Sequence, residues 1–194
     1  MQKRAFLKSL GLLSASLPLV SWDSAHPAYD PKTLLPKAIK KGDTVGLISP
    51  SAATADRMQF TYAKEALEAL GFEVKLGKNL MNRRGHLAGT DAERAGDLND
   101  MFADKKVKAI VSIRGGSGAA RILTLIDDKA ISKNPKPLLG YSYITALNCA
   151  IQAQTGLITF NGPLGSGSWN IFNLYQFEKV FLVLGKATTQ NIHD

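Results

Sequence analysis

The sequence contains few of the residues that build disulfide frameworks and metal centres. Its 194 residues include one cysteine and three histidines. A single thiol cannot form a disulfide within the chain, and no metal-ligand spacing surrounds Cys149. Because Cys149 falls inside an apolar helical pattern, we expect it to be a small core residue. The sequence therefore predicts neither a disulfide nor a bound metal.

Apolar runs long enough to cross a membrane are also missing at the N-terminus. The apolar stretch at residues 9–20 is too short to span a bilayer. It follows the basic segment 2–8 and precedes Ser24 and Ala25, a pattern typical of an export signal over residues 1–25. The order Lys-Arg-Ala-Phe-Leu-Lys is similar to a twin-arginine signal with lysine in the first arginine position, and Sec export is the alternative.

This signal predicts an exported, periplasmic protein that has no membrane contact once the signal is removed. If residues 1–25 instead form an amphipathic N-terminal helix of the domain, the protein would remain cytoplasmic.

Basic residues outnumber acidic ones, but they form no nucleic-acid-binding stripe. The formal net charge is +8. Apart from residues 37–41 and the pair Arg83-Arg84, most cations are interspersed with carboxylates, and no aromatic residues interleave with them. This pattern argues against nucleic acid as a partner. A mildly basic surface favours acidic ligands such as cell-wall fragments.

A nucleotide cofactor is not predicted either. The segment from Gly116 to Arg121 begins like the dinucleotide-binding pattern Gly-x-Gly-x-x-Gly, but Arg121 stands in place of the third glycine. No Gly-x-x-x-x-Gly-Lys-Ser/Thr motif occurs. The glycines in the turn at residues 114–118 instead favour a close approach of the backbone to a ligand or an oxyanion.

Strand-like and helix-like patterns alternate along the chain. This alternation predicts an α/β fold with a mostly parallel sheet flanked by helices. Parallel strands bring the loops that follow them to one edge of the sheet. We expect loops 49–52, 114–118, 141–143 and 161–163 to meet there. The expected strands are 43–49, 72–76, 107–113, 137–141 and 157–160, and the expected helices are 56–70, 90–103, one carrying Ile122, Leu123 and Ile126, and 142–154.

Ser142 lies where an apolar strand pattern changes into a helical one. A serine at a sharp strand-to-helix turn can be a nucleophile, because its hydroxyl is exposed beside free backbone N–H groups. The pattern Gly-x-Ser-x-Gly is not met, since Ile144 replaces the second glycine. Serine is also a common helix N-cap, which is the simpler interpretation of these residues alone.

Several motifs, taken in order, resemble one known family. They are Val-Gly-Leu-Ile-Ser-Pro-Ser at 45–51, Ala-Gly-Thr-Asp-Ala-Glu-Arg at 88–94, Arg-Gly-Gly-Ser-Gly-Ala at 114–119, Gly-Tyr-Ser-Tyr-Ile-Thr-Ala-Leu at 140–147 and Thr-Phe-Asn-Gly-Pro at 159–163. Residues 39–186 thereby resemble the N-terminal domain of the L,D-carboxypeptidases, serine peptidases that include muramoyltetrapeptide carboxypeptidase. The resemblance implies a connector at 26–38, a nucleophile domain at 39–186, and a linker from 187–194 towards a C-terminal domain absent from this chain.

The resemblance also implies a site and a reaction. Ser142 corresponds to the family's nucleophile, and the backbone N–H groups of Gly116 and Tyr143 correspond to the oxyanion hole. The histidine and glutamate of the family's triad come from the C-terminal domain, which is a possible partner, as is a second copy of the chain. The implied substrate is a peptidoglycan tetrapeptide, from which terminal D-alanine is released without a cofactor or metal.

Three positions depart from the family's pattern, and they keep other functions open. Tyr143 replaces an aspartate, Ser117 a tyrosine and Asn161 a histidine. None of the three histidines stands at a triad position of the family; they are His26, His86 and His193. Alternatives to an incomplete carboxypeptidase are a non-catalytic module that binds cell-wall peptides and an amidase that cleaves peptide–nucleotide conjugates.

The segment 169–184 is rich in apolar residues. They either form an exposed patch that a partner domain covers or pack back on the sheet. These residues are Phe172, Leu174, Phe177, Val180, Phe181 and Leu184.

Overall fold

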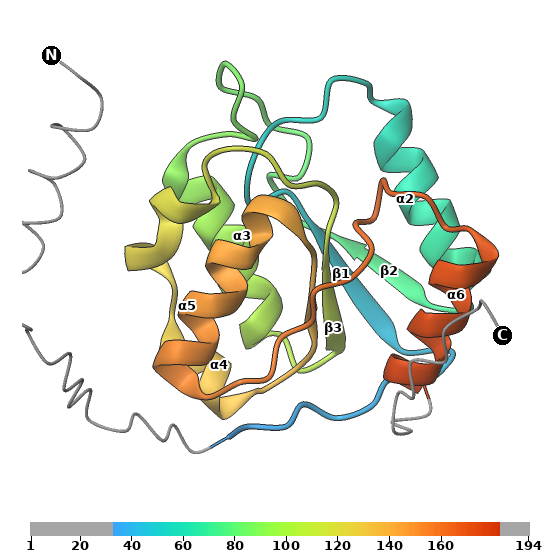
Figure 1. Cartoon of the computed structure of the whole chain (residues 1–194). Coiled ribbons are helices and arrows are strands. Elements are labelled where there is room, and N and C mark those ends of the chain that lie inside the picture. Colours follow the sequence, from blue (N-terminus) through green and yellow to red (C-terminus); the bar gives the residue numbers. More distant parts are fainter. Residues whose placement is uncertain (1–32, 183–194) are drawn as a thin grey trace, which may run out of the picture. The chain divides into compact units, whose positions relative to one another are not determined.

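The computed structural model describes residues 33–182 and shows a four-stranded parallel sheet (Figure 1). The strand order is β2-β1-β3-β4, and every neighbouring pair is parallel. This confirms the predicted α/β fold. The predicted export signal at residues 1–25, with His26 and His193, lies outside the described residues. The strands are β1 Thr44–Ile48, β2 Glu73–Leu76, β3 Val107–Ser112 and β4 Leu138–Leu139.

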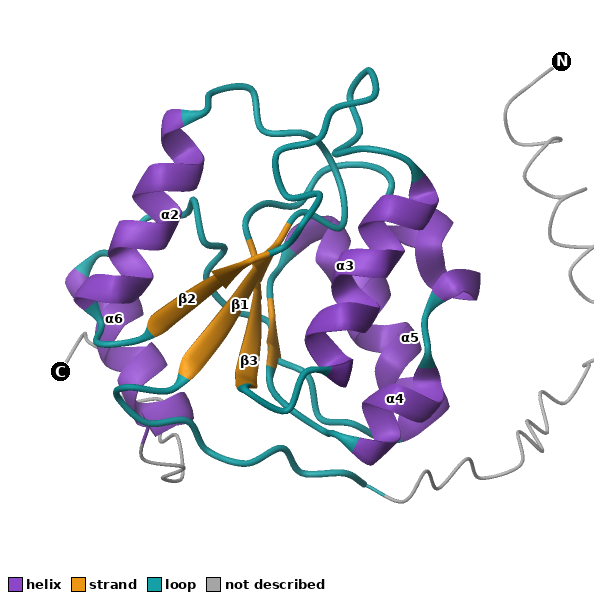
Figure 2. Cartoon of the chain, turned by 180° about the vertical axis from the view of Figure 1, so that it is seen from behind, coloured by secondary structure: helices purple, strands orange, loops and turns teal. Residues whose placement is uncertain are grey.

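Helices cover both faces of the sheet (Figure 2). Helices α2 and α6 lie on one face, and α3, α4 and α5 lie on the other. No helix within residues 33–182 is long and apolar enough to cross a membrane. The α-helices are α2 Met58–Ala69, α3 Asp91–Ala103, α4 Asp128–Lys133, α5 Thr145–Thr155 and α6 Ile171–Phe177, and a π-helical turn, Glu178–Leu182, follows α6.

The strands are buried on both faces, which explains their nearly continuous apolar sequences. In β1, Val45 and Leu47 belong to the apolar cluster under α2 and α6, whereas Ile48 belongs to the cluster under α3, α4 and α5. In β3, Val111 belongs to the cluster under α2 and α6, and Ile110 belongs to the cluster under α3, α4 and α5. These strands thus contribute to two apolar clusters, one on each face of the sheet.

Two predicted elements are wrong in kind. Residues 157–160 form no strand, because the two ends of the segment bridge different partners, Leu157 with Leu34 and Phe160 with Leu139, and neither bridge continues into a ladder. The predicted helix after Gly118 is instead a 3-10 helix, Ala119–Leu125. It stops there because Asp127 caps a new helix, α4, accepting a hydrogen bond from Ala130 N at 2.9 Å.

The prediction for Cys149 is also wrong, because its side chain is exposed. On α5, Leu147, Asn148 and Ile151 are the buried residues. Their 3.6-residue spacing turns the intervening Cys149 outward.

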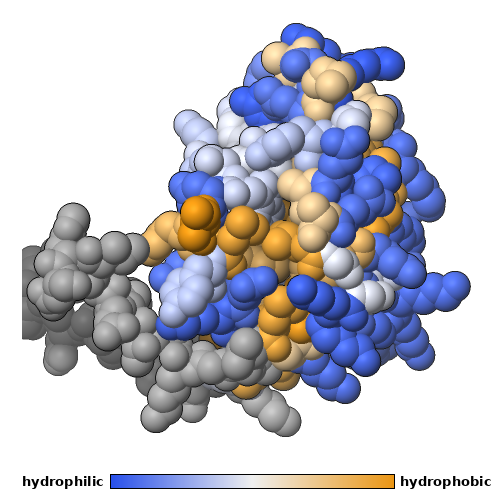
Figure 3. Space-filling model, turned by 90° about the vertical axis from the view of Figure 1, so that its right-hand side faces the viewer, coloured by the Kyte–Doolittle hydropathy of each residue, from blue (hydrophilic) through white to orange (hydrophobic). Residues whose placement is uncertain are grey.

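In the apolar segment that includes α6, some of the predicted apolar side chains pack on the sheet and others form an exposed patch. Phe177 and Phe181 pack into the core with β1 and β3, and their rings stack with centroids 4.7 Å apart. Ile171 and Phe172 remain 86% and 49% exposed. Figure 3, which looks onto the right-hand side of Figure 1, shows a band of apolar side chains between hydrophilic areas. Leu184 lies outside the described residues.

Helix α3 is secured at both ends. At its start, Thr90 and Glu93 form the predicted capping box, with Thr90 N donating to Glu93 Oε2 at 2.7 Å. At its end, the ammonium of Lys136 donates to Met101 O at 2.9 Å and to Asp104 O at 2.7 Å. Lys136 is only 3% exposed, and burial lowers its pKa to about 8.

We expect the stability of the chain to rise with pH above 8 because of Lys136. Its pKa of about 8 in the folded state lies below the value of about 10.4 for an unfolded chain. Between these values the unfolded state holds the extra proton, so raising the pH favours folding. Urea unfolding of the wild type from pH 7 to 10 should show this rise, and Lys136→Met should lack it.

Lys133→Met is the matched control, because Lys133 lies nearby, at the end of α4, but is exposed. It should keep the rise. If the free energy of unfolding changed with pH in the same way in the wild type and in Lys136→Met, the rise could not be assigned to Lys136.

Candidate active site

Ser142 has a strained backbone at the turn between β4 and α5. Tyr141 is extended, with φ −133° and ψ −173°. Ser142 then adopts φ +63° and is the one residue other than glycine with positive φ within residues 33–182. A short 3-10 turn, Ser142–Ile144, leads directly into α5. Strain of this kind typically costs about 1–3 kcal/mol and clusters at functional sites.

The simpler interpretation, that Ser142 is a helix cap, is not supported. No side-chain cap hydrogen bond is made at the start of either the 3-10 turn or α5. The Ser142 side chain is exposed and therefore accessible to a ligand.

The glycine turn lies directly against Ser142, as predicted from the topology of the sheet. A Cβ atom placed on Gly115 would be 3.0 Å from Ser142 Cβ and 3.3 Å from Ser142 Oγ. Gly116 has φ +95°, and a Cβ atom there would come within 2.6 Å of Ala52 Cβ. Glycine at both positions therefore allows the turn to fit between Ser142 and the loop after β1.

Hydrogen bonds hold this turn on its far side. The Ser51 hydroxyl, fully buried, donates to the carbonyls of Gly116 and Ser117, the latter at 3.2 Å. Arg114 Nη1 donates to Ala53 O at 3.0 Å. The loop after β1 thus supports the glycine turn from behind.

A pocket of about 330 Å³ opens at Ser142. It confirms that loops 114–118 and 141–143 meet at one edge of the sheet. Loop 161–163 instead borders an adjacent pocket of about 560 Å³, which shares Tyr141 with the first and continues along α6. The pocket at Ser142 is lined by Gln59, Arg114, Gly115, Gly116, Tyr141, Ser142, Leu164 and Ser166.

Several of these residues carried no recognisable sequence signal. Gln59 lies in the first turn of α2, and Ser166 is held at the pocket wall because its hydroxyl donates to Ile113 O at 2.7 Å. The run of glycines and serines at 165–168 marks a loop but does not show where that loop packs.

The pocket holds no acid or base beside Ser142 within the described residues. Arg114 is the one side chain lining it that carries a fixed charge. His86 is exposed and lines neither this pocket nor the one along α6. No group of three or more histidine, cysteine or carboxylate side chains suited to a metal occurs within residues 33–182. The arrangement therefore presents a hydroxyl and backbone amides but no base.

An exposed serine in a strained strand-to-helix turn, next to a glycine turn, is the arrangement that serine hydrolases of α/β fold use. Residues 45–162 match the LD-carboxypeptidase N-terminal domain. The chain belongs to the LD-carboxypeptidase family.

Individual relatives agree with this assignment. The chain is 47% identical over 144 residues to the probable murein peptide carboxypeptidase of Bacillus subtilis, a match that covers 74% of this chain and 45% of that protein. It is 37% identical over 132 residues to the microcin C7 self-immunity protein MccF of Escherichia coli, covering 67% and 38%. The crystal structure of an MccF-like protein from Bacillus anthracis matches with a TM-score of 0.73 and 33% identity, covering 77% and 47%. The chain spans less than half the length of these relatives.

We expect Gly116→Ala to lower the free energy of unfolding by about 1–3 kcal/mol, the usual cost of a strained backbone conformation. The new methyl group would also lie 2.6 Å from Ala52 Cβ. Urea unfolding measures the change.

Gly96→Ala is the matched control. Gly96 lies within α3, and a Cβ atom there meets no other atom within 4 Å. Because alanine is favoured over glycine by about 1 kcal/mol inside a helix, this variant should be more stable than the wild type. Equal stability of the Gly116→Ala variant and the wild type would refute the proposed fit of the turn.

Proposed function

We propose that this chain is the nucleophile-bearing part of a serine L,D-carboxypeptidase that releases terminal D-alanine from peptidoglycan tetrapeptides. The observation that carries the proposal is Ser142, exposed at φ +63° against the glycine turn. In the proposed reaction, Ser142 Oγ attacks the carbonyl carbon of the amide before D-alanine. The amine of D-alanine leaves with a proton, and water then hydrolyses the acyl-enzyme.

The proposed oxyanion hole consists of the backbone N–H groups of Gly116 and Tyr143. No acceptor within residues 33–182 takes a hydrogen bond from Gly116 N. Tyr143 precedes Ile144, whose N–H donates to Tyr141 O at 3.3 Å, so Tyr143 N belongs to the helix start, where amides have no intrahelical partner. Two donors near an attacking hydroxyl are what a tetrahedral oxyanion needs. Tyr143 contributes only its backbone in this proposal, since its side chain is 59% exposed.

The base and the acid of the proposed mechanism come from outside residues 33–182. The pocket contains neither histidine nor carboxylate, and a serine hydroxyl is a weak nucleophile without a base. The additional length of the relatives offers a source for both groups. The proposed partner of this chain is therefore a second domain that covers the pocket at Ser142.

A second candidate function is cleavage of an amide in a peptide–nucleotide conjugate. The identity of 37% to the microcin C7 self-immunity protein favours it. Some structures of that protein contain glutamyl sulfamoyl guanosine or aspartyl sulfamoyl adenosine. The two functions share Ser142 and the oxyanion hole and differ in the leaving group.

We expect the 194-residue chain alone to release D-alanine from a muropeptide tetrapeptide no faster than its Ser142→Ala variant does. Loss of triad residues in a serine peptidase costs on the order of 10⁶-fold in turnover. Chromatography of free D-alanine measures the rate. Ser142-dependent release at an ordinary enzymatic rate would contradict the proposal that the base lies elsewhere, and His86→Ala would then be the first variant to test.

A chimera tests the reaction itself. The chain, joined to the C-terminal half of the Bacillus subtilis relative, should release D-alanine, and Ser142→Ala should abolish the release. A folded chimera that instead cleaves an aminoacyl sulfamoyl nucleoside would favour the second candidate. A folded chimera that binds the tetrapeptide but cleaves neither substrate would favour a cell-wall-peptide binding module.

We also expect the isolated chain to self-associate through the apolar surface beside the site. Ile171 and Phe172 are exposed on α6, and Tyr141 and Tyr143 are exposed at the nucleophile turn. Light scattering should show an average mass that rises with concentration, and the double variant Ile171→Ser/Phe172→Ser should reduce the rise. Leu125→Ser is the control, because Leu125 is an apolar residue that is 45% exposed at the end of the 3-10 helix, away from α6 and Ser142. A monomer at every concentration would count against this surface as a partner-covered one.

A further inference from the structure

A second pocket lies at the end of the sheet opposite to Ser142. It has a volume of about 520 Å³ and is formed by residues near the starts of β1 and β3 and by the turn before β4. Ser142 follows the C-terminal end of β4, so the two pockets occupy opposite edges of one parallel sheet. The second pocket is therefore not part of the proposed active site.

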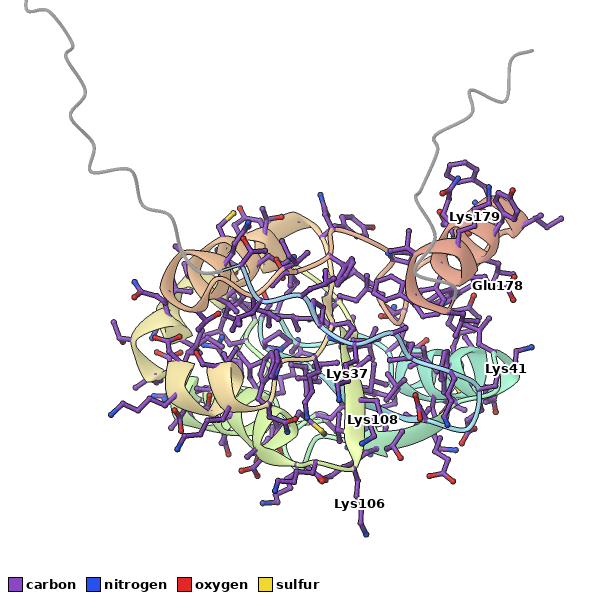
Figure 4. All side chains as sticks on the ribbon, turned by 90° about the horizontal axis from the view of Figure 1, so that it is seen from below. Lys37, Lys41, Lys106, Lys108, Glu178 and Lys179 are labelled. Atoms are coloured by element: carbon purple, nitrogen blue, oxygen red, sulfur yellow. The ribbon has the colours of Figure 1, made fainter. Side chains whose placement is uncertain are left out.

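Lysine dominates the lining of this pocket. Three separate segments contribute five lysines, and the one carboxylate among the lining residues is Asp43. Asp43 Oδ2 already accepts a hydrogen bond from Lys40 N at 2.9 Å. Figure 4, seen from below, shows Lys37 and Lys108 near the centre of this face. The five lysines are Lys37, Lys105, Lys108, Lys133 and Lys136.

None of these lysines forms an ion pair with another described residue, although nearby cations do. Asp104, the nearest carboxylate in sequence to Lys105, is paired with Lys75 at 2.6 Å. Two of the five ammonium groups are held in place by carbonyls: Lys108 Nζ donates to Lys105 O at 2.7 Å, and Lys136 Nζ donates to Met101 O and Asp104 O. The pocket thus gathers five lysines, none of them in an ion pair with a described residue, around the single lining carboxylate of Asp43.

We propose that this pocket binds a phosphate-bearing ligand that carries at least two negative charges. Ammonium groups gathered in a concavity raise the local positive potential, and a multivalent anion relieves their mutual repulsion. Lysine binds phosphate as a point charge. The lining contains no arginine, so the pocket cannot bind a planar carboxylate through the bidentate hydrogen bonds of a guanidinium group. The volume lies within the range of small-ligand sites, about 300–1,000 Å³.

The lining argues against a nucleic acid as the ligand. Binding of single strands relies on aromatic side chains on which bases stack, and the pocket has none. Its uncharged wall consists of Leu35, Ala38, Val107 and Pro135, together with the amide side chain of Asn134. The phosphate group can belong to a soluble molecule or to a lipid headgroup, and the experiment below distinguishes these sources.

The test is calorimetric titration of the chain with inorganic pyrophosphate in phosphate-free buffer. We expect saturable binding that the double variant Lys37→Gln/Lys108→Gln weakens by about tenfold, or about 1.4 kcal/mol, because it removes two ammonium groups from the pocket lining. The matched control is Lys41→Gln/Lys106→Gln, which removes the same charge from the same face (Figure 4) but from outside the pocket lining. The control should change the affinity less than twofold, or about 0.4 kcal/mol.

Three results would overturn the proposal. They are no binding of pyrophosphate by the wild type, equal weakening in both double variants, or full affinity in the pocket variant. Thermal unfolding of each variant verifies that it is folded. Ser142→Ala should bind pyrophosphate as the wild type does, so this result is independent of the proposed carboxypeptidase activity.

Vesicles identify the source of the phosphate group. Sedimentation with phosphatidylglycerol vesicles that depends on Lys37 and Lys108, and that pyrophosphate reverses, would support a lipid headgroup as the ligand. Pyrophosphate binding without such sedimentation would support a soluble phosphate compound. Vesicle binding that both double variants reduce equally would contradict a defined pocket.

Discussion

The arrangement of the site depends on the buried guanidinium of Arg94. This side chain is 1% exposed, and its Nη1 donates to Pro50 O at 2.7 Å and to Gly118 O at 2.8 Å. Its Nη2 pairs with Asp91, whose other carboxylate oxygen binds Arg121 at 2.8 Å. Removing a charge from water costs several kcal/mol, so a buried arginine persists only where partners surround it. Arg94 therefore fixes the loop after β1 and the glycine turn to each other and to α3.

The position of Ser142 follows from this connection in several steps. The capping box starts α3 at Thr90 and so sets the direction in which Arg94 points. Arg94 and Ser51 hold the glycine turn from behind, and the turn then lies so close to Ser142 that a Cβ atom on Gly115 would be 3.0 Å from Ser142 Cβ. The strained backbone of Ser142 is thus supported by contacts made on another part of the sheet, which is how a local conformation of higher energy survives in a folded protein.

Periodicity in the sequence was enough to predict the sheet, since the strands are buried on both faces and the helices keep one apolar side. Capping residues likewise predicted the start of α3 correctly. Periodicity failed at residues 157–160, whose two ends bridge different segments of the chain, and at Cys149, whose helix turns it outward. The role of Arg94 could not be predicted, because an arginine beside a capping box is usually solvated and only the folded loops supply its carbonyl partners.

The nucleophile interpretation of Ser142 needed more than its own sequence. The residues around it fit a helix cap equally well, and the family resemblance was required to prefer a nucleophile. The structure adds the physical difference between these two roles. A capping serine satisfies the first amides of its helix, whereas here no side-chain cap forms and Gly116 N has no acceptor within the described residues. In the proposed mechanism, free amides beside an exposed hydroxyl would stabilise the negative charge that develops on a substrate, so the proposal uses the same amides that a capping serine would have satisfied.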